Sequence, residues 1–282
     1  MLDYSRPLAA IRTDPSWFRK IATGVLVLLI PYLGWVWGWG WLMQYQRRVA
    51  WGDDTHLPEW SDFGPQCMLG LTAYVAILPY TLVASMLVTP VLIALVAVVP
   101  IAVIAMGAGS VPFPAELQGE IPLLIYGITF AVMYPALWLL TALLYPLTAS
   151  IQVRVALMGT LESGFQFGEI WRLMRAARRE LMRVWGWSVL NLLIPFAAGA
   201  IVYGAAFAVW LLLPGAIETR ILVGVLLGLI AMLLCLTVVG ALRMYLSVAN
   251  AHYAAQYARV AYGLEERLQA MAVDVESAVA EA

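Results

Sequence analysis

Charged residues are absent from five long stretches of the chain, and these stretches predict its membrane segments. They cover residues 21–46, 67–115, 121–153, 184–217 and 221–242. A helix needs roughly 17–25 apolar residues to cross a bilayer. The second stretch is long enough for two crossings, and a turn is predicted at Thr89-Pro90. Because the alternation of membrane β-strands is absent, we expect six helical segments, near 21–45, 67–88, 91–108, 121–146, 184–213 and 220–247.

The composition supports an all-α, polytopic helical membrane protein. Hydrophobic residues make up 63% of the 282 residues and charged residues 12%, against about a quarter charged in a typical soluble domain. There is too little polar surface to cover a soluble body of this size. A soluble globular enzyme, a disordered chain and a nucleic-acid binder are therefore excluded, and a formal net charge of −1 attracts no acidic partner.

The distribution of Lys and Arg predicts the orientation. Segments 1–20 and 154–183 are rich in basic residues, whereas loop 109–120 carries Glu116 and Glu120 and no basic residue. We therefore expect both termini on the cytoplasmic side of a multi-pass protein, and loops 109–120 and 214–220 outside.

The first segment, 21–45, has two interpretations. Pro31 and the alternating tryptophans Trp35, Trp37, Trp39 and Trp41 argue against one regular helix. The segment is either a short, kinked span or a re-entrant hairpin that returns 46–66 to the cytoplasm. Six crossings keep both termini on the cytoplasmic side, which favours the span. The basic pair at 47–48 favours the hairpin.

Two internal similarities indicate a possible pseudo-repeat. Residues 28–31 match 192–195, and residues 44–52 resemble 256–263. We expect a single helical membrane domain over 1–263, with possible halves at 1–110 and 147–263. If the repeat is real, 46–52 and 257–263 lie on the same face, which supports the re-entrant hairpin.

Two amphipathic helices are expected on the cytoplasmic side. Residues 165–183 carry an apolar stripe opposite four arginines that form a possible partner or lipid surface, Arg172, Arg175, Arg179 and Arg183. The simpler interpretation is a topology signal with membrane anchoring. Residues 264–282 form an acidic amphipathic helix, which either folds back on the basic face or docks on a partner.

Residues for chemistry are scarce, and we predict no catalytic, cofactor-binding or metal site. Loop 52–64 gathers candidate metal ligands, Asp53, Asp54, His56, Glu59 and Asp62, but their spacing matches no metal site and a solvated loop is the better interpretation. His252 is expected to make an interfacial hydrogen bond. Asp14-Pro15 is read as a helix start.

The same loop carries a resemblance. The sequence Leu57-Pro58-Glu59-Trp60-Ser61-Asp62-Phe63, after a Gly- and Trp-rich first segment, resembles the prokaryotic multi-pass membrane family known as domain of unknown function 4013. Phe165-Gln166-Phe167-Gly168-Glu169-Ile170 and Gln256-Tyr257-Ala258-Arg259 add to it. The resemblance implies a plasma (inner) membrane protein and carries no catalytic residues. Within the motif, we expect Pro58 to fix a turn, Glu59 or Asp62 to cap a helix beginning near Phe63, and Trp60 and Phe63 to act as anchors.

These observations predict a non-enzymatic integral membrane protein that acts as a scaffold or accessory subunit. Its expected partners are membrane lipids, some of them bound, and other membrane proteins; no cofactor and no nucleic acid is expected. The alternative is a transporter, channel or lipid-handling protein with a cavity formed by Pro-kinked helices.

Overall fold

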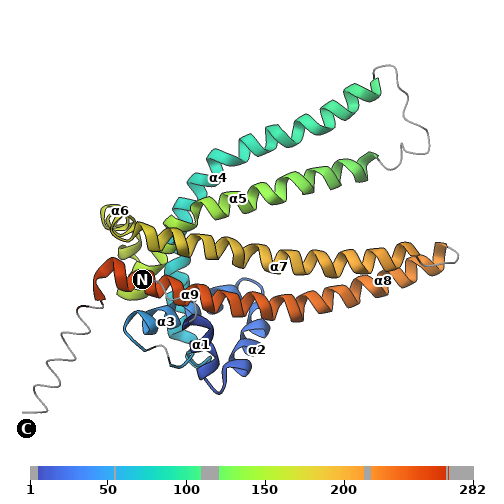
Figure 1. Ribbon diagram of the computed structural model, residues 1–282. Helices are drawn as coiled ribbons and strands as arrows, with labels where there is room; N and C mark the ends of the chain where they lie inside the picture. Colours follow the sequence, from blue (N-terminus) through green and yellow to red (C-terminus); the bar gives the residue numbers. More distant parts are fainter. Residues whose placement is uncertain (1–5, 54, 109–120, 213–216, 265, 267–282) are drawn as a thin grey trace, which may run out of the picture. The chain divides into compact units, whose positions relative to one another are not determined.

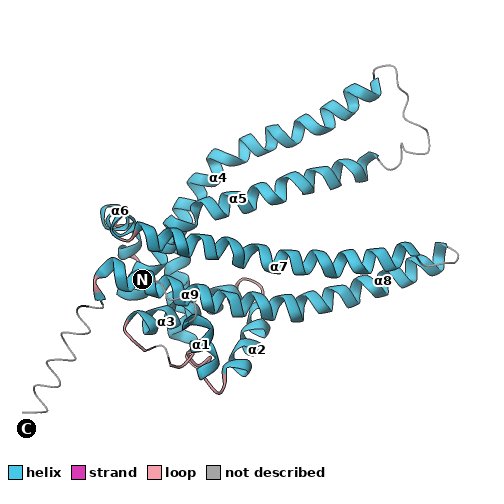
Figure 2. Ribbon diagram, viewed as in Figure 1, coloured by secondary structure: helices cyan, strands magenta, loops and turns pink. Residues whose placement is uncertain are grey.

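The protein is helical throughout the part that the structure describes. A computed structural model describes residues 6–53, 55–108, 121–212, 217–264 and 266 (Figure 1), and within these ranges there is no strand (Figure 2). The α-helices are α1 (Arg6–Thr13), α2 (Trp17–Leu28), α3 (Leu33–Ala50), α4 (Phe63–Ala108), α5 (Ile121–Met158), α6 (Phe167–Ala176), α7 (Arg178–Leu212), α8 (Ile217–Leu234) and α9 (Gly240–Tyr262). A 3₁₀ turn, η2 (Glu162–Phe165), precedes α6, and a π-helical turn, η3 (Cys235–Val239), joins α8 to α9.

The chain forms two compact units. Unit 1 combines Met1–Ala76 with Pro146–Ala282, and unit 2 is Ile77–Tyr145. Unit 1 therefore contains the start of α4, the end of α5 and all of α7 to α9. This division follows the two long helices α4 and α5.

Four helical segments are long and apolar enough to cross a membrane. They are Phe63–Leu87, Leu140–Met158, Arg178–Ala206 and Leu222–Tyr262, among the described residues. The predicted turn at Thr89-Pro90 is wrong, because α4 continues through both residues. Proline is tolerated inside membrane helices, where neighbouring groups satisfy the freed backbone carbonyls.

The first predicted segment, 21–45, is two helices and not one. The helix α2 ends at Leu28, and α3 begins at Leu33. Between them Tyr32 has φ +59°, a left-handed conformation that is uncommon for a residue with a bulky side chain. At about 1.5 Å per residue, the 12 residues of α2 extend only about 18 Å.

The helix α9 is the core of unit 1. It packs against α1, α2, α3, α6 and α7. Its buried residues fall on nearly every side of the helix: Met244, Leu246, Val248, Ala249, Ala251, His252, Tyr253, Ala254, Ala255, Tyr257 and Ala258. Alanines dominate this list, and their small side chains allow several helices to approach α9 at once.

Helices α3 and α4 cross in close backbone contact. A Cβ atom added to Gly40 would lie 1.7 Å from the Gln66 carbonyl oxygen, and one added to Gly70 would lie 1.9 Å from the Val36 carbonyl oxygen. Only glycine fits at either position. This crossing fixes the start of α4 against α3.

The predicted amphipathic helix 165–183 is interrupted. The helix α6 ends at Ala176, Ala177 lies outside the helical region, and α7 begins at Arg178. The buried stripe is Ile170, Leu173, Ala177 and Leu181. Phe167 and Trp171, two large apolar residues of the same segment, are exposed. The predicted helix 264–282 lies almost wholly outside the described residues, as does loop 109–120.

Candidate functional site

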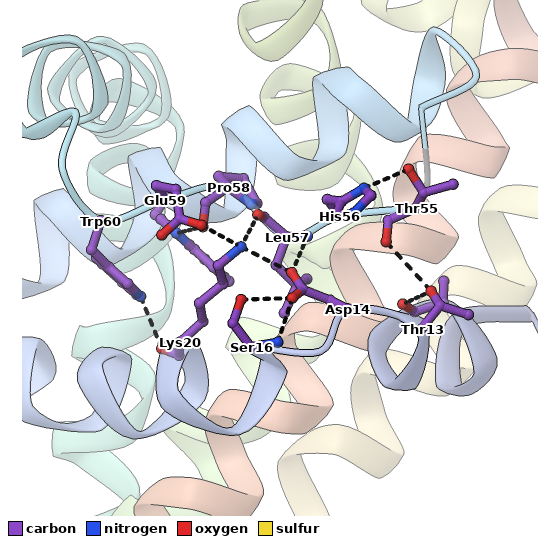
Figure 3. Close-up of polar contacts among 12 residues, drawn as sticks. Thr13, Asp14, Ser16, Lys20, Thr55, His56, Leu57, Pro58, Glu59 and Trp60 are labelled. Atoms are coloured by element: carbon purple, nitrogen blue, oxygen red, sulfur yellow. Dashed lines mark hydrogen bonds and ion pairs between the residues drawn. The ribbon is translucent and has the colours of Figure 1, made fainter.

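A buried ion pair joins the N-terminal helices to residues 57–63, which we call the family-like motif. Lys20, on α2, places its Nζ 2.9 Å from Asp14 Oδ2, and only 4% and 1% of the two side chains are exposed. The same Nζ donates to the Leu57 carbonyl oxygen at 2.7 Å and lies 2.8 Å from Glu59 Oε1. Figure 3 shows these groups converging. We call Asp14, Ser16, Lys20, Leu57, Glu59 and Trp60 the Lys20 junction.

Asp14 is saturated with hydrogen-bond donors. Its Oδ1 accepts the Ser16 backbone N–H at 2.8 Å and the Ser16 hydroxyl at 2.7 Å, and its Oδ2 accepts the Leu57 N–H at 2.9 Å. Burial would raise the pKa of Asp14, but the hydrogen bonds from Ser16, Lys20 and Leu57 outweigh it and hold the pKa well below its usual range. The carboxylate is therefore ionised near neutral pH and bridges two segments far apart in the sequence.

Two tryptophans complete the attachment of the motif. Trp60 Nε1 donates to the Lys20 carbonyl oxygen at 2.8 Å, and Trp41 Nε1 donates to the Pro58 carbonyl oxygen at 3.0 Å. The two indoles stack, with ring centroids 4.7 Å apart. The motif loop is thus held to α2 on one side and to α3 on the other.

Gln66, on the first turns of α4, extends this polar network. Its Nε2 donates to Gln44 Oε1 at 2.8 Å and to the Glu59 carbonyl oxygen at 2.7 Å, and its Oε1 accepts from Trp37 Nε1 at 2.7 Å. Trp37 also meets Trp60 and Phe63 edge to face. Hydrogen bonds therefore connect α2, α3 and α4 with the motif loop. In this network each donor of the Gln66 amide has an acceptor, and its oxygen has a donor.

A second set of polar contacts joins α9 to α3 and α5. Tyr45 Oη lies 3.0 Å from His252 Nδ1, and Ser150 Oγ lies 3.1 Å from Tyr257 Oη. Arg259 Nε donates to the Val49 carbonyl oxygen at 2.8 Å. This contact brings 46–52 and 257–263 together. His252 is buried and makes its hydrogen bond to Tyr45 within the protein.

Arg154, near the end of α5, is a buried arginine that orders the segment before α6. Its Nε donates to the Ser163 carbonyl oxygen at 3.0 Å, and the guanidinium also contacts Gln166, Tyr262 and, at 3.7 Å, the Glu169 carboxylate. Gln166 and Glu169 belong to the Phe165–Ile170 string of the resemblance. This string, like the motif, forms a packing contact.

The motif residues are brought together, though not in every predicted role. The helix α4 begins at Phe63, as expected. Neither carboxylate caps it: Glu59 pairs with Lys20, and Asp62 accepts a hydrogen bond from the Ser61 hydroxyl. Trp60 is half-buried in the stack, whereas Phe63 is exposed.

The other candidate residues are dispersed. Within the described residues, no three Asp, Glu, His or Cys side chains come close enough to hold a metal ion, and Asp54 lies outside those residues. Arg172 and Arg175 lie on α6, and Arg179 and Arg183 on α7, on either side of the break. Arg172 pairs with Glu169, and Arg175 lies over the Trp171 ring at 5.6 Å.

The first internal similarity, between residues 28–31 and residues 192–195, is not matched by a similar local structure. Residues 28–31 end α2 and begin the following turn, whereas residues 192–195 lie inside α7. Asp14 and Lys20 were missed as site residues by sequence reasoning. Lys20 is the only lysine of the chain and directly precedes an apolar stretch, which was one available signal.

The comparisons with known proteins point to one family. The family described as "Protein of unknown function (DUF4013)" matches residues 23–204, which is more than half of the chain. The match includes the whole 57–63 motif and Arg154. No curated protein and no solved structure matches the chain.

Proposed function

The chain belongs to the DUF4013 family, and we propose that it is a non-enzymatic scaffold of the prokaryotic plasma membrane. In this proposal four helical segments cross the bilayer as two hairpins. The packed part of unit 1 forms a cytoplasmic base, and other membrane proteins bind to the exposed faces of the hairpin α7–α8.

The charge distribution supports a cytoplasmic base. The start of α4, the end of α5, the start of α7 and the end of α9 all belong to unit 1. Every Lys and Arg of the chain except Arg220 lies outside the two connections α4–α5 and α7–α8 and their flanking turns. Basic residues are retained on the cytoplasmic side, so the base and both termini are assigned there.

The pair α2–α3 is assigned as a re-entrant or interfacial hairpin on the same side. The 12 residues of α2 are too short for the ~30 Å hydrocarbon core. The start of α2 is joined to the loop that follows α3, because Lys20 Nζ donates to the Leu57 carbonyl oxygen and Trp60 Nε1 donates to the Lys20 carbonyl oxygen. A crossing by the first segment would place this start and this loop on opposite sides of the membrane.

One observation carries the scaffold proposal: the spans of α7 and α8–α9 bury little of their surface within the chain. Only 6% of the most apolar window of each is buried, against 39% for Leu140–Met158. A Cβ atom added to Gly199, Gly204 or Gly228 would meet no atom within 4 Å. Small residues allow close approach of membrane helices, and those on α7 are left uncovered, including the exposed series Ala197, Ala200, Gly204 and Ala208.

The test is extraction of native membranes in mild detergent, native-size separation and mass spectrometry of co-migrating proteins. The wild-type chain is expected to co-migrate with one defined membrane protein, and Gly204→Leu to reduce that co-migration. Gly168→Leu, the same change at an exposed position of α6 outside the hairpin, is the matched control. Migration of the wild-type chain alone, or loss of the partner in neither variant, overturns the proposal.

The alternative, a transporter or channel with a cavity between Pro-kinked helices, has less support. Pro79 and Pro90 lie within α4 and Pro195 within α7, and both helices continue through them. No broken helix offers its backbone groups to a solute in these segments.

A further inference from the structure

A cavity of about 600 Å³ lies between the pair α2–α3 and the rod formed by η3 and α9. Its lining residues belong to these elements and to the turn between α2 and α3, all in unit 1, and most are apolar. Its volume falls within the ~300–1,000 Å³ typical of ligand sites. It is separate from the Lys20 junction and from the face of α7 assigned to partner helices.

The cavity is produced by small residues and by the π-helical turn. Gly38 and Gly240 line it without side chains. A Cβ on Gly38 would lie 3.1 Å from Leu28 Cδ2, and one on Gly240 would lie 3.3 Å from Val25 Cγ1. The π turn Cys235–Val239 forms the opposite wall, and such turns are frequent at functional sites.

The cavity changes from apolar to polar along the rod. Cys235, Leu236 and Val239 line one end, and Arg243 and Ser247 line the other. The rise from residue 235 to residue 247 is about 18 Å, close to half of the ~30 Å hydrocarbon core. The charge-free stretch 221–242 ends immediately before Arg243, so the polar end lies where a lipid headgroup meets the hydrocarbon.

Arg243 is available to bind an anion. Its side chain is exposed, and it makes no hydrogen bond or ion pair within the described part of the chain. A guanidinium matches the geometry of a phosphate with two parallel hydrogen bonds. Ser247 lies one turn further on the same helix face and also lines the cavity, so a hydroxyl stands beside the cation.

We propose that this cavity binds one anionic phospholipid. Its phosphate contacts Arg243 and Ser247, and an acyl chain lies along Cys235, Leu236 and Val239 between α2 and the rod. The charge of the arginine selects an anionic lipid, and the apolar end accepts the chain. The site would anchor the short pair α2–α3 against α9 and does not depend on the scaffold proposal.

The experiment is a titration of the purified, delipidated full-length protein with phosphatidylglycerol or phosphatidylcholine, followed by native mass spectrometry. The wild-type chain is expected to bind one phosphatidylglycerol and to prefer it over phosphatidylcholine. Arg243→Gln should weaken phosphatidylglycerol binding about tenfold, the scale of a lost charged hydrogen bond. Arg243→Lys should keep part of the preference, because the charge remains. Arg12→Gln, at an exposed position of α1, is the matched control and should bind like the wild type.

A second variant tests the acyl end independently. Val239→Trp fills the cavity and should weaken the binding of both lipids to a similar extent. The proposal is overturned if Arg243→Gln binds like the wild type, if Arg12→Gln loses as much affinity as Arg243→Gln, or if Val239→Trp has no effect. If Arg243→Gln does not fold, the proposal is tested with the other two variants. It is then overturned if Arg243→Lys keeps the full preference for phosphatidylglycerol or if Val239→Trp binds both lipids like the wild type.

Discussion

The indole of Trp60 lies flat on the indole of Trp41, with the two ring planes 1° from parallel and their centroids 4.7 Å apart. Each ring also donates its N–H across the interface, Trp60 to the Lys20 carbonyl and Trp41 to the Pro58 carbonyl. The motif loop therefore holds α2 and α3 together through the stacking of the two indoles and through the hydrogen bonds that their N–H groups donate. This arrangement gives the family-like motif a structural role.

Replacing Trp60 by alanine should destabilise the base. The substitution removes the stack and one hydrogen bond, and large aromatic truncations in packed sites cost about 3–5 kcal/mol. The measurement is the thermal unfolding midpoint in detergent. Trp51→Ala is the control, because the Trp51 side chain is 46% exposed. An unchanged midpoint for Trp60→Ala would mean that the motif serves binding instead.

Removing one partner of the Asp14–Lys20 pair should cost less once the other partner has already been removed. Lys20→Met leaves a buried carboxylate without its cation, a loss of roughly 3–5 kcal/mol. In the double variant Asp14→Leu with Lys20→Met, the two losses should be less than additive. Denaturant or thermal unfolding of the four proteins measures the coupling. Arg19→Met, at an exposed neighbouring position, controls for loss of positive charge, and additive single-variant effects would refute the coupling.

Acid should weaken the base through Asp14. Because its pKa is lower in the folded protein than the ordinary 3.8, the ionised carboxylate stabilises the fold at pH values above about 4. This contribution is lost as the pH falls further toward the folded-state pKa. The difference in unfolding midpoint between wild type and Asp14→Asn should be largest at neutral pH and should narrow below about pH 4. A difference in unfolding midpoint that stays constant down to pH 3 would show that the ionised Asp14 carboxylate does not stabilise the fold.

Glycine is required where α3 crosses α4. Gly70→Ala places a Cβ 1.9 Å from the Val36 carbonyl oxygen and forces the helices apart, at a cost of at least about 1–3 kcal/mol. Gly64→Ala, on the first turn of the same helix, meets no atom within 4 Å and should leave stability nearly unchanged. Detergent thermal unfolding distinguishes the two. Equal effects would mean that helix propensity, and not the crossing, determines the result.

The distribution of charges was sufficient to predict helical membrane segments but not their number. A charge-free run looks the same whether it is one long helix, as in α4, or two spans joined at a proline. The interruption at Ala177 was also missed, because α6 and the start of α7 share one buried stripe across the turn. The burial of α9 beyond residue 247 was not predicted, because the alanines of this part are only weakly hydrophobic.

The motif was found from the sequence, but its contacts were not. Asp14 and Lys20 are six residues apart, and their pairing depends on the turn Asp14–Ser16 and on the Leu57 backbone, some 40 positions away. No local pattern encodes such a contact. Glu59 was expected to cap α4, yet the buried cation of Lys20 offers a stronger partner than the helix N-terminus, and the carboxylate turns toward it.

The most direct test of the account is the side of the membrane on which the motif loop lies. Cysteines introduced singly at Thr55, Thr160 and Ser110, with Cys67 and Cys235 replaced, would be labelled in intact and permeabilised cells with an impermeant maleimide. Four spans and a cytoplasmic base predict that Thr55→Cys and Thr160→Cys react only after permeabilisation, and that Ser110→Cys reacts in intact cells. Labelling of Thr55→Cys in intact cells would place the motif loop outside the cytoplasm and would contradict the account.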